Sequence, residues 1–214
     1  MINLLGTVDD EIAVAVSGGS DSMAALHFLR NGGKRKILAL HFNHGTDHAA
    51  DAEALVTSYC YNNNIPLVIG ELKKEMPKGA SKENFWRENR YSFFTREAGN
   101  RPVITCHHLD DVVETWLFTS FHGNPMLIPH SRDNFVRPFL ATRKSDLTDW
   151  CNKKGVPFVF DDSNNDIKYM RNFIRNKIIN DVLIINPGIH KTLKKKVIRS
   201  YKDKLLMEKK YVSF

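Results

Sequence analysis

Short apolar runs alternate with helix-like patterns along the first 160 residues of the chain. Runs of β-branched and other apolar side chains, each bounded by glycine, proline or polar residues, predict buried strands. We expect five strands, at residues 12–16, 36–42, 66–72, 102–106 and 156–160. Between them, apolar residues recur at three- and four-residue spacing and predict amphipathic helices. These helices are expected at residues 20–31, 49–62, 82–98, 107–121 and 143–154.

Strands that alternate with helices predict βαβ units, in which successive strands run parallel and helices cover the sheet. The predicted fold class is therefore α/β, with a doubly wound five-stranded parallel sheet and a short C-terminal helical tail. Residues 123–134 are expected to form a loop and residues 135–140 an extended segment. Ligands of such sheets bind beyond the carboxyl ends of the strands, so polar residues there are candidates for a site.

A last helical pattern covers residues 172–211 and is interrupted by the turn signal Asn186-Pro187-Gly188. We therefore divide the chain into a domain at residues 1–186 and a tail at residues 187–214. The tail carries nine Lys and Arg against two acidic residues, which accounts for the whole net charge of +7. A basic tail beside a neutral body is typical of a protein with a polyanionic partner, although a solvated helix face has the same composition.

The tail also contains an apolar stripe. Leu193, Val197, Tyr201 and Leu205 recur at helical spacing. We expect this stripe to pack on the body of the protein or on another chain, through self-association or a partner protein.

The composition argues against several classes of protein. The three cysteines, Cys60, Cys106 and Cys151, lie far apart with no Cys-x-x-Cys pair. This spacing argues against a disulfide framework and against a zinc or iron–sulfur site. No apolar run reaches membrane-spanning length, and the first residues lack a basic segment followed by an apolar one. We therefore expect a cytoplasmic protein with no membrane partner.

The string Ser17-Gly18-Gly19-Ser20-Asp21-Ser22 follows the first predicted strand and opens the first predicted helix. Glycines at such a turn let a phosphate approach the backbone, and the helix N-terminus supplies N–H groups and a positive dipole end. Asp21 lies among these donors, where its carboxylate can hold a magnesium ion brought by the phosphates. The alternative is an ordinary strand–turn–helix corner with Ser20 or Asp21 as its N-cap. The string has neither the Gly-Lys-Ser/Thr of a Walker loop nor the spacing of a dinucleotide fingerprint.

A second group of polar residues follows the fourth predicted strand. His107, Asp110, Asp111 and Glu114 stand at i, i+3, i+4 and i+7, so a helix that begins at His107 would carry all of them on one face. Three carboxylates on one face are costly unless cations meet them, such as magnesium or a cationic substrate. The alternative for Asp110 and Asp111 is stabilisation of the helix dipole, which Glu114 would serve less well.

The loop of residues 17–22 resembles the pyrophosphate loop (PP-loop) of ATP pyrophosphatases. Together with the polar group of His107, Asp110, Asp111 and Glu114 (the acidic stripe) and further motifs in the same order, it resembles the N-terminal catalytic domain of the tRNA(Ile)-lysidine synthetase family. The resemblance covers about residues 10–188. The further motifs are His41-Phe42-Asn43-His44-Gly45, the run from Glu83 to Phe94, Arg137-Pro138-Phe139-Leu140 with Arg143-Lys144, Asp161-Asp162-Ser163-Asn164-x-Asp166, and Arg171-Asn172-x-Ile174-Arg175.

The resemblance implies a ligase that uses ATP and Mg2+. Such an enzyme adenylates the C2 carbonyl oxygen of the wobble cytidine in tRNA(Ile) with a CAU anticodon, and the amine of free L-lysine then displaces AMP. The implied nucleotide-binding residues are Ser17, Gly18, Gly19, Ser20, Asp21, Ser22, His41, Asn43, His44 and Gly45. The implied catalytic residues are Asp21, which is also the metal ligand, with His107, Asp110, Asp111 and Glu114. The implied substrate- and RNA-binding residues are Arg87, Arg90, Tyr91, Arg171, Asn172 and Arg175.

The chain also departs from the family pattern. Thr46-Asp47 stands where the family usually has Leu-Arg, and Cys106 stands where a small residue is usual. Family members continue beyond the catalytic domain into further domains that help to hold the tRNA. For Arg171 and Arg175 the alternative is ion pairing with Asp161, Asp162 or Asp166.

Two alternative functions remain open from the sequence. The first is another PP-loop tRNA-modifying enzyme, such as a thiolase, although thiolases generally need paired cysteines. The second is a nucleotide-binding regulator or RNA-binding subunit without ligase activity. Release of pyrophosphate that depends on both RNA and lysine would distinguish the ligase from both.

Overall fold

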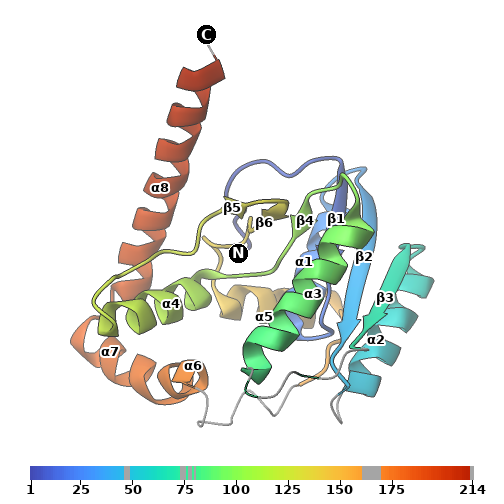
Figure 1. The fold of residues 1–214 in the computed structure, drawn as a ribbon, viewed down its shortest axis with the longest axis horizontal. Coiled ribbons are helices and arrows are strands. Elements are labelled where there is room, and N and C mark those ends of the chain that lie inside the picture. Colours follow the sequence, from blue (N-terminus) through green and yellow to red (C-terminus); the bar gives the residue numbers. More distant parts are fainter. Residues whose placement is uncertain (46–48, 73–75, 77–78, 80, 161–169, 213–214) are drawn as a thin grey trace.

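The computed structural model describes residues 1–45, 49–72, 76, 79, 81–160 and 170–212 (Figure 1). The motif predicted at Asp161 to Asp166 therefore lies outside the described residues. The described part forms a six-stranded sheet with strand order β3-β2-β1-β4-β6-β5, in which only the β5–β6 pair is antiparallel. The strands are β1 (Glu11–Ala15), β2 (Lys36–Asn43), β3 (Leu67–Glu71), β4 (Val103–Ile104), β5 (Ser131–Arg132) and β6 (Phe135–Val136).

The helices follow the predicted ranges closely. They are α1 (Ser20–Asn31), α2 (Ala49–Asn62), α3 (Lys82–Ala98), α4 (Leu109–Phe121), α5 (Lys144–Lys154), α6 (Met170–Phe173), the π-helical turn η2 (Ile174–Ile178), α7 (Ile179–Ile185) and α8 (Ile189–Val212). The α/β class and the alternation of strands with helices are confirmed. No helix of the described residues is both long enough and apolar enough to span a bilayer.

Helices cover both faces of the sheet, which explains why the central strands read as continuous apolar runs. Along β1, Ile12 and Val14 belong to the hydrophobic cluster formed with α1, α2 and α5. Ala13 points to the other face and belongs to the cluster that includes Phe93 and Phe94 of α3. Figure 1 shows α3 lying across this second face.

The prediction of a fifth parallel strand at residues 156–160 is wrong. That segment makes only an isolated bridge, in which the N–H of Val159 donates to the carbonyl oxygen of Gly18 at 3.0 Å. Pro157 lies inside the segment and has no N–H to give to a ladder. The place beside β4 is taken by β6, where Phe135 is buried, so the sheet has six strands instead of five.

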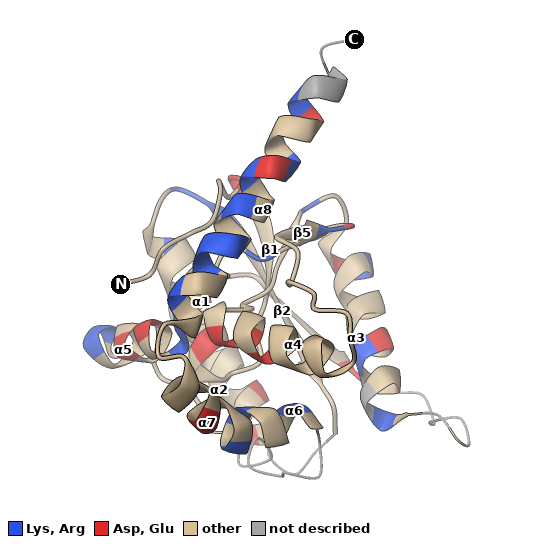
Figure 2. Cartoon of the chain, turned by 90° about the vertical axis from the view of Figure 1, so that its left-hand side faces the viewer, with Lys and Arg blue, Asp and Glu red and all other residues tan. Residues whose placement is uncertain are grey.

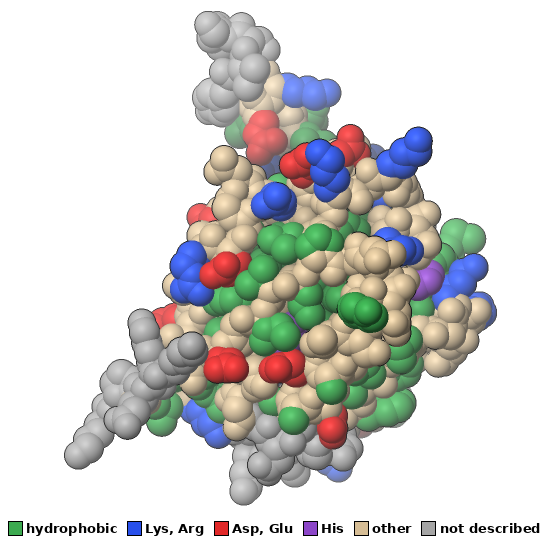
Figure 3. All heavy atoms as spheres, turned by 90° about the vertical axis from the view of Figure 1, so that its right-hand side faces the viewer, with side chains coloured by type: hydrophobic (Ala, Val, Ile, Leu, Met, Phe, Trp, Pro, Cys, Tyr) green, Lys and Arg blue, Asp and Glu red, His purple; other side chains and the backbone are tan. Residues whose placement is uncertain are grey.

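The sheet ends at β3, whose outer edge has no neighbouring strand among the described residues. Ile69 of this strand is exposed, and Figure 3 shows hydrophobic side chains across the middle of this face with charged side chains around them. The site described below lies elsewhere, at the carboxyl ends of β1, β2 and β4.

The turn at Asn186-Pro187-Gly188 separates α7 from α8, as the sequence predicted. The predicted apolar stripe of α8 packs on the body along its first half: Leu193 and Val197 are buried in one cluster with Val112 and Val113 of α4. The ring of Tyr201 lies 4.5 Å from that of His130. Farther along, Leu205, Leu206 and Met207 are exposed, and this part of α8 projects from the body (Figure 1).

The two halves of α8 should therefore respond differently to truncation of a leucine. Leu193 is 1% exposed and Leu206 is 67% exposed. We expect Leu193→Ala to lower the free energy of unfolding by about 2–5 kcal/mol, because it leaves a cavity. Leu206→Ala should change the free energy of unfolding by less than about 0.5 kcal/mol. Urea unfolding of both variants measures the difference, and equal effects would show that the first half of α8 does not pack on α4.

Candidate active site

The turn between β1 and α1 has a backbone that suits a phosphate. Gly18 has φ +89°, in the left-handed region that favours glycine, and a Cβ there would lie 3.1 Å from the Cβ of Ala52. Gly19 is the N-cap of α1 and provides no side-chain cap. The alternative in which Ser20 or Asp21 caps this helix is therefore wrong. The first N–H groups of α1 are left without an N-cap side chain, as an anion-binding helix end requires.

The serines of the loop hold its shape. The hydroxyl of Ser22 accepts the N–H of Ser17 at 3.1 Å and donates to the carbonyl oxygen of Gly19 at 3.0 Å. The hydroxyl of Ser20 lies 3.5 Å from that of Thr148, so α5 contacts the loop as well.

The end of β2 lies beside this loop and brings two histidines to it. The Nδ1 atom of His41 lies 2.8 Å from the carbonyl oxygen of Val16, and the ring of His44 lies 5.3 Å from that of Trp86. The His41 Nε2 and His44 Nδ1 atoms are buried and have no hydrogen-bond partner among the described residues. Burial lowers the pKa of His41 and lowers that of His44 to about 4, so both rings are neutral.

Asn43 and Gly45 shape the backbone that follows. The side-chain amide of Asn43 donates to Glu53 at 2.7 Å, and its Oδ1 atom accepts the N–H of Gly45 at 2.8 Å. Gly45 has φ +69°, which again favours glycine.

The acidic helix begins two residues later than predicted. Helix α4 starts at Leu109, and His108 is its N-cap. The prediction that His107 shares a helix face with the three acids is therefore wrong: His107 lies before the helix, and its Nδ1 atom contacts the hydroxyl of Thr105 at 2.9 Å. Burial lowers the pKa of His107 to about 4, which leaves the ring uncharged.

His108, which was not among the site residues predicted from the sequence, occupies the centre of the site. Its backbone N–H donates to Asp111 Oδ2 at 2.9 Å, and its ring accepts the N–H of Asp111, which completes a capping box. The other ring nitrogen, Nε2, lies 3.4 Å from Asp21 Oδ2. Burial alone would lower the pKa of His108, but the carboxylates of Asp111, Asp21 and Asp110 raise it above its ordinary value. The sequence contained one indication of this role: Asp111 stands three residues after His108, which is the spacing of a capping box.

Asp21 also has an ammonium group beside it. The ammonium of Lys144, the first residue of α5, lies 3.8 Å from Asp21 Oδ2. Burial alone would raise the pKa of Asp21, but His108, Lys144 and Arg175 hold it below its ordinary value.

Asp110 fastens two other helices to α4. Its Oδ2 atom accepts the backbone N–H of Lys144 at 2.8 Å, and its Oδ1 atom lies 3.2 Å from Nε2 of His190, near the start of α8. Burial opposes ionisation, but His190 and the Lys144 N–H lower the pKa of Asp110 strongly.

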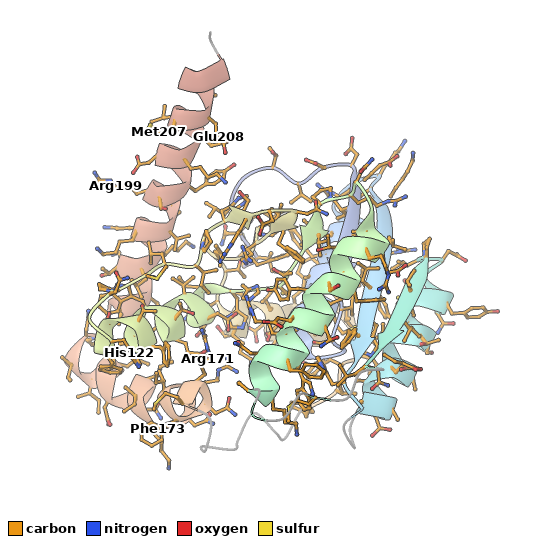
Figure 4. The ribbon with its side chains drawn as sticks, in the orientation of Figure 1. His122, Arg171, Phe173, Arg199, Met207 and Glu208 are labelled. Carbon is orange, nitrogen blue, oxygen red and sulfur yellow. The ribbon has the colours of Figure 1, made fainter. Side chains whose placement is uncertain are left out.

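Glu114 is 3% exposed and is neutralised by two arginines. Arg171 donates to Glu114 Oε1 at 2.9 Å, and Arg175 donates to Oε2 through Nε at 3.0 Å and Nη2 at 2.6 Å. The same Nη2 of Arg175 contacts Asp111 Oδ1 at 3.3 Å. The sequence predicted that magnesium or a cationic substrate would offset the acids of this helix. In the structure, Arg171 and Arg175 of the same chain offset part of that charge. Figure 4 shows Arg171 between α6 and α4.

Both arginines come from the segment in which α6 passes into the π-helical turn η2. Such turns occur frequently at functional sites. Asn172 lies on the same segment, next to Arg171. The alternative acidic partners predicted for these arginines, Asp161 to Asp166, lie outside the described residues.

The basic and aromatic residues predicted on α3 form a separate group. Arg87 and Arg90 lie 4.5 and 5.9 Å from the ring of Tyr91, which itself lies 4.5 Å from the ring of Phe135 in β6. Burial lowers the pKa of Arg90. This group adjoins the sheet beside His44 and Trp86, whereas Arg171 and Arg175 adjoin α4.

Asp21 fits a magnesium ion that arrives with phosphates. No group of three or more His, Cys, Asp or Glu among the described residues is arranged to hold a metal ion by itself. Magnesium is commonly held by one or two carboxylates together with substrate phosphates, and Asp21 offers such a carboxylate beside the loop.

The loop, the fold and the site define a PP-loop protein. The chain belongs to the PP-loop domain family, whose model matches residues 3–182. It is 35% identical over 196 residues to the tRNA(Ile)-lysidine synthase of Thermotoga sp. (strain RQ2), covering 84% of this chain and 47% of that protein. It is 36% identical over 189 residues to the tRNA(Ile)-lysidine synthase of Staphylococcus aureus (strain COL), covering 80% of this chain and 44% of that protein.

The chain therefore spans about half the length of these curated relatives. Among solved structures, the NH3-dependent NAD synthetase from Campylobacter jejuni has a similar fold, with a TM-score of 0.51 and 16% sequence identity. The match covers 91% of this chain and 87% of that one.

The pairing of Glu114 with two arginines can be tested by neutralising the carboxylate. We expect Glu114→Gln to lower the free energy of unfolding by about 3 kcal/mol, because it removes one partner of a buried charge network. Glu88→Gln, at an exposed position of α3, is the matched control and should change the free energy of unfolding by less than about 0.5 kcal/mol. Urea unfolding at neutral pH measures both. A Glu114→Gln variant as stable as the control would mean that Arg171 and Arg175 are not held by Glu114.

Proposed function

We propose that this chain is an ATP-dependent ligase of the tRNA(Ile)-lysidine synthase type. It adenylates the wobble cytidine of tRNA(Ile) with a CAU anticodon and joins free L-lysine to it, releasing AMP and pyrophosphate. The observation that carries the proposal is the contact of Asp21 in the PP-loop with His108 at the start of the acidic helix, 3.4 Å apart. This contact supports the proposal because it joins the PP-loop to the start of the acidic helix in a chain 35% identical to a tRNA(Ile)-lysidine synthase.

In the first step, the C2 carbonyl oxygen of the cytidine attacks the α-phosphorus of ATP and pyrophosphate leaves. Gly18 and Gly19 would let the phosphates reach the first N–H groups of α1, and Asp21 would hold the metal ion. Magnesium bound with ATP supplies positive charge that offsets the charge of the phosphates. His41 and His44, at and just beyond the end of β2, are the further residues proposed to contact the nucleotide.

In the second step, an amine of lysine attacks C2 and AMP leaves. Asp111 and Glu114 are the carboxylates proposed to receive the cationic part of lysine, and the ion pairs with Arg171 and Arg175 fix their positions. The side chains of these arginines are partly exposed, at 46% and 33%, so they can also contact RNA phosphates. Asn172 on the same segment, and Arg87, Arg90 and Tyr91 on α3, are the further proposed RNA contacts. Because its substrate is a tRNA, the proposed activity belongs in the cytoplasm.

The two alternative functions, a thiolase and a regulator or RNA-binding subunit without ligase activity, require different chemistry of this chain. A thiolase would need reactive thiols, whereas burial raises the pKa of Cys60 and Cys151 to about 11 and that of Cys106 well above its ordinary value. A regulator or an RNA-binding subunit would bind the nucleotide without turning it over.

The deciding experiment measures pyrophosphate release from ATP with total tRNA, with and without lysine. We expect release that requires tRNA, and incorporation of labelled lysine into one tRNA. Asp21→Asn should lower the rate about a hundredfold or more, because it removes the proposed metal ligand while keeping the shape of the side chain. Asp51→Asn, at an exposed acid in the first turn of α2, is the control and should leave the rate unchanged.

Other outcomes of that experiment point elsewhere. Pyrophosphate release that depends on tRNA without any lysine incorporation would favour a different PP-loop modification. Binding of ATP without any turnover would favour the regulator.

The outer surface of α8 is the proposed electrostatic contact with RNA. Figure 2, in which Lys and Arg positions are blue, shows several of them along this helix. Replacing the exposed Lys195, Lys196 and Arg199 with Gln should weaken tRNA binding and lower the slope of log affinity against log salt by up to about 0.9 for each lost phosphate contact. Binding measured at several salt concentrations gives the slope. An unchanged slope, with a changed oligomeric state, would instead assign this surface to self-association.

A further inference from the structure

Lys144 contacts two of the acidic residues of the site in two different ways. Its backbone N–H donates to Asp110 at 2.8 Å, and its ammonium lies 3.8 Å from the carboxylate of Asp21. Because it is the first residue of α5, its Cα atom is fixed by the packing of α5 against α1. The residue is therefore held beside the PP-loop, where its ammonium and the ring of His108 both approach Asp21 Oδ2.

An ion pair of this kind adds little to the stability of the fold. The side chain of Lys144 is 44% exposed, and solvent screens its attraction to Asp21. The position of the ammonium, beside the proposed metal-binding carboxylate, has a clearer consequence for a bound polyanion. A cation at that place attracts phosphate groups that enter the loop.

The two groups beside Asp21, the ring of His108 and the ammonium of Lys144, differ in their freedom to move. His108 is buried, and both its backbone and its ring are bonded to Asp111. Lys144 carries its charge on a flexible four-carbon stem that is partly exposed. When a metal ion and phosphates arrive at Asp21, Lys144 is the cation that can leave the carboxylate and follow the phosphates.

We propose that Lys144 is a phosphate-binding residue of the site, which contacts the pyrophosphate part of ATP, and that Asp110 is the positioning residue that holds it there. This proposal rests on the use of ATP in the proposed function. During adenylation the bond between the α-phosphorus and its bridging oxygen breaks, and the electron pair stays on pyrophosphate. The leaving group gains negative charge, which an ammonium stabilises without giving up its proton.

The test is equilibrium binding of MgATP, magnesium pyrophosphate and AMP to the full chain, measured by titration calorimetry. We expect Lys144→Ala to weaken binding of MgATP and of pyrophosphate by about tenfold or more, since it removes a charge-assisted contact. Binding of AMP, which lacks the pyrophosphate part, should change by less than about twofold. Lys144→Arg keeps the charge and should restore most of the affinity for MgATP.

Lys153→Ala is the matched control on the same helix. Lys153 is exposed in the last turn of α5, and its replacement should leave all three affinities unchanged. Asp110→Asn should reduce the ratio of MgATP affinity to AMP affinity by several fold. A merely structural role of Asp110 would lower the unfolding temperature without changing this ratio.

The outcomes separate the two proposals. If Lys144→Ala binds MgATP as tightly as the wild type, the role of Lys144 is overturned, whether or not lysine incorporation is observed. If Lys144→Ala loses MgATP affinity selectively but the wild type incorporates no lysine, the role of Lys144 is supported and the ligase function fails. A wild-type chain that binds no MgATP overturns both.

Discussion

The structure depends on one electrostatic constraint, the balance of four carboxylates gathered beside the PP-loop. Asp21, Asp110, Asp111 and Glu114 lie close together in a partly or fully buried setting, where unpaired charges are costly. The side chains that pair with them come from different parts of the chain: the ring of His108 precedes α4, the ammonium of Lys144 belongs to the first residue of α5, the guanidinium groups of Arg171 and Arg175 lie on α6 and η2, and the ring of His190 lies near the start of α8. Because each pair joins two elements, neutralising the site also fixes the relative positions of these elements.

This arrangement links the PP-loop to the surfaces that we propose contact RNA. Contacts run from Asp21 through His108 and Asp111 to Arg175 and Glu114, and from there to the partly exposed Arg171. A second route runs from the loop through Lys144 and Asp110 to His190, at the base of a helix whose outer part projects from the body. Figure 4 shows Met207 and Glu208 on that projecting part and Arg199 lower on the same helix, on the side away from the sheet. A polyanion bound at either surface would meet residues that contact the acids of the site.

Hydrophobic packing provides the frame for these charges. The clusters on the two faces of the sheet hold β1, β2 and β4, whose carboxyl ends carry the loop, the two histidines of β2 and the start of α4. A third cluster joins α4 to α8 through residues such as Val113 and Leu193. The acidic helix is therefore fixed by apolar contacts on one side and by ion pairs on the other.

The sequence alone determined the features that depend on residues close together along the chain. The spans of α2 and α3, the break at Asn186-Pro187-Gly188 and the glycine turn after β1 were predicted, because periodicity and turn chemistry are local properties. Tertiary structure decided which distant residues meet. Residues 156–160 looked like a strand by composition, but β6 took the place beside β4. His107 and His108 are adjacent and chemically identical, and only the start of α4 decided that His108 faces Asp21. The arginines that neutralise Glu114 lie 57 and 61 residues away along the chain, and the charge of an acid does not specify which distant cation the fold will bring to it.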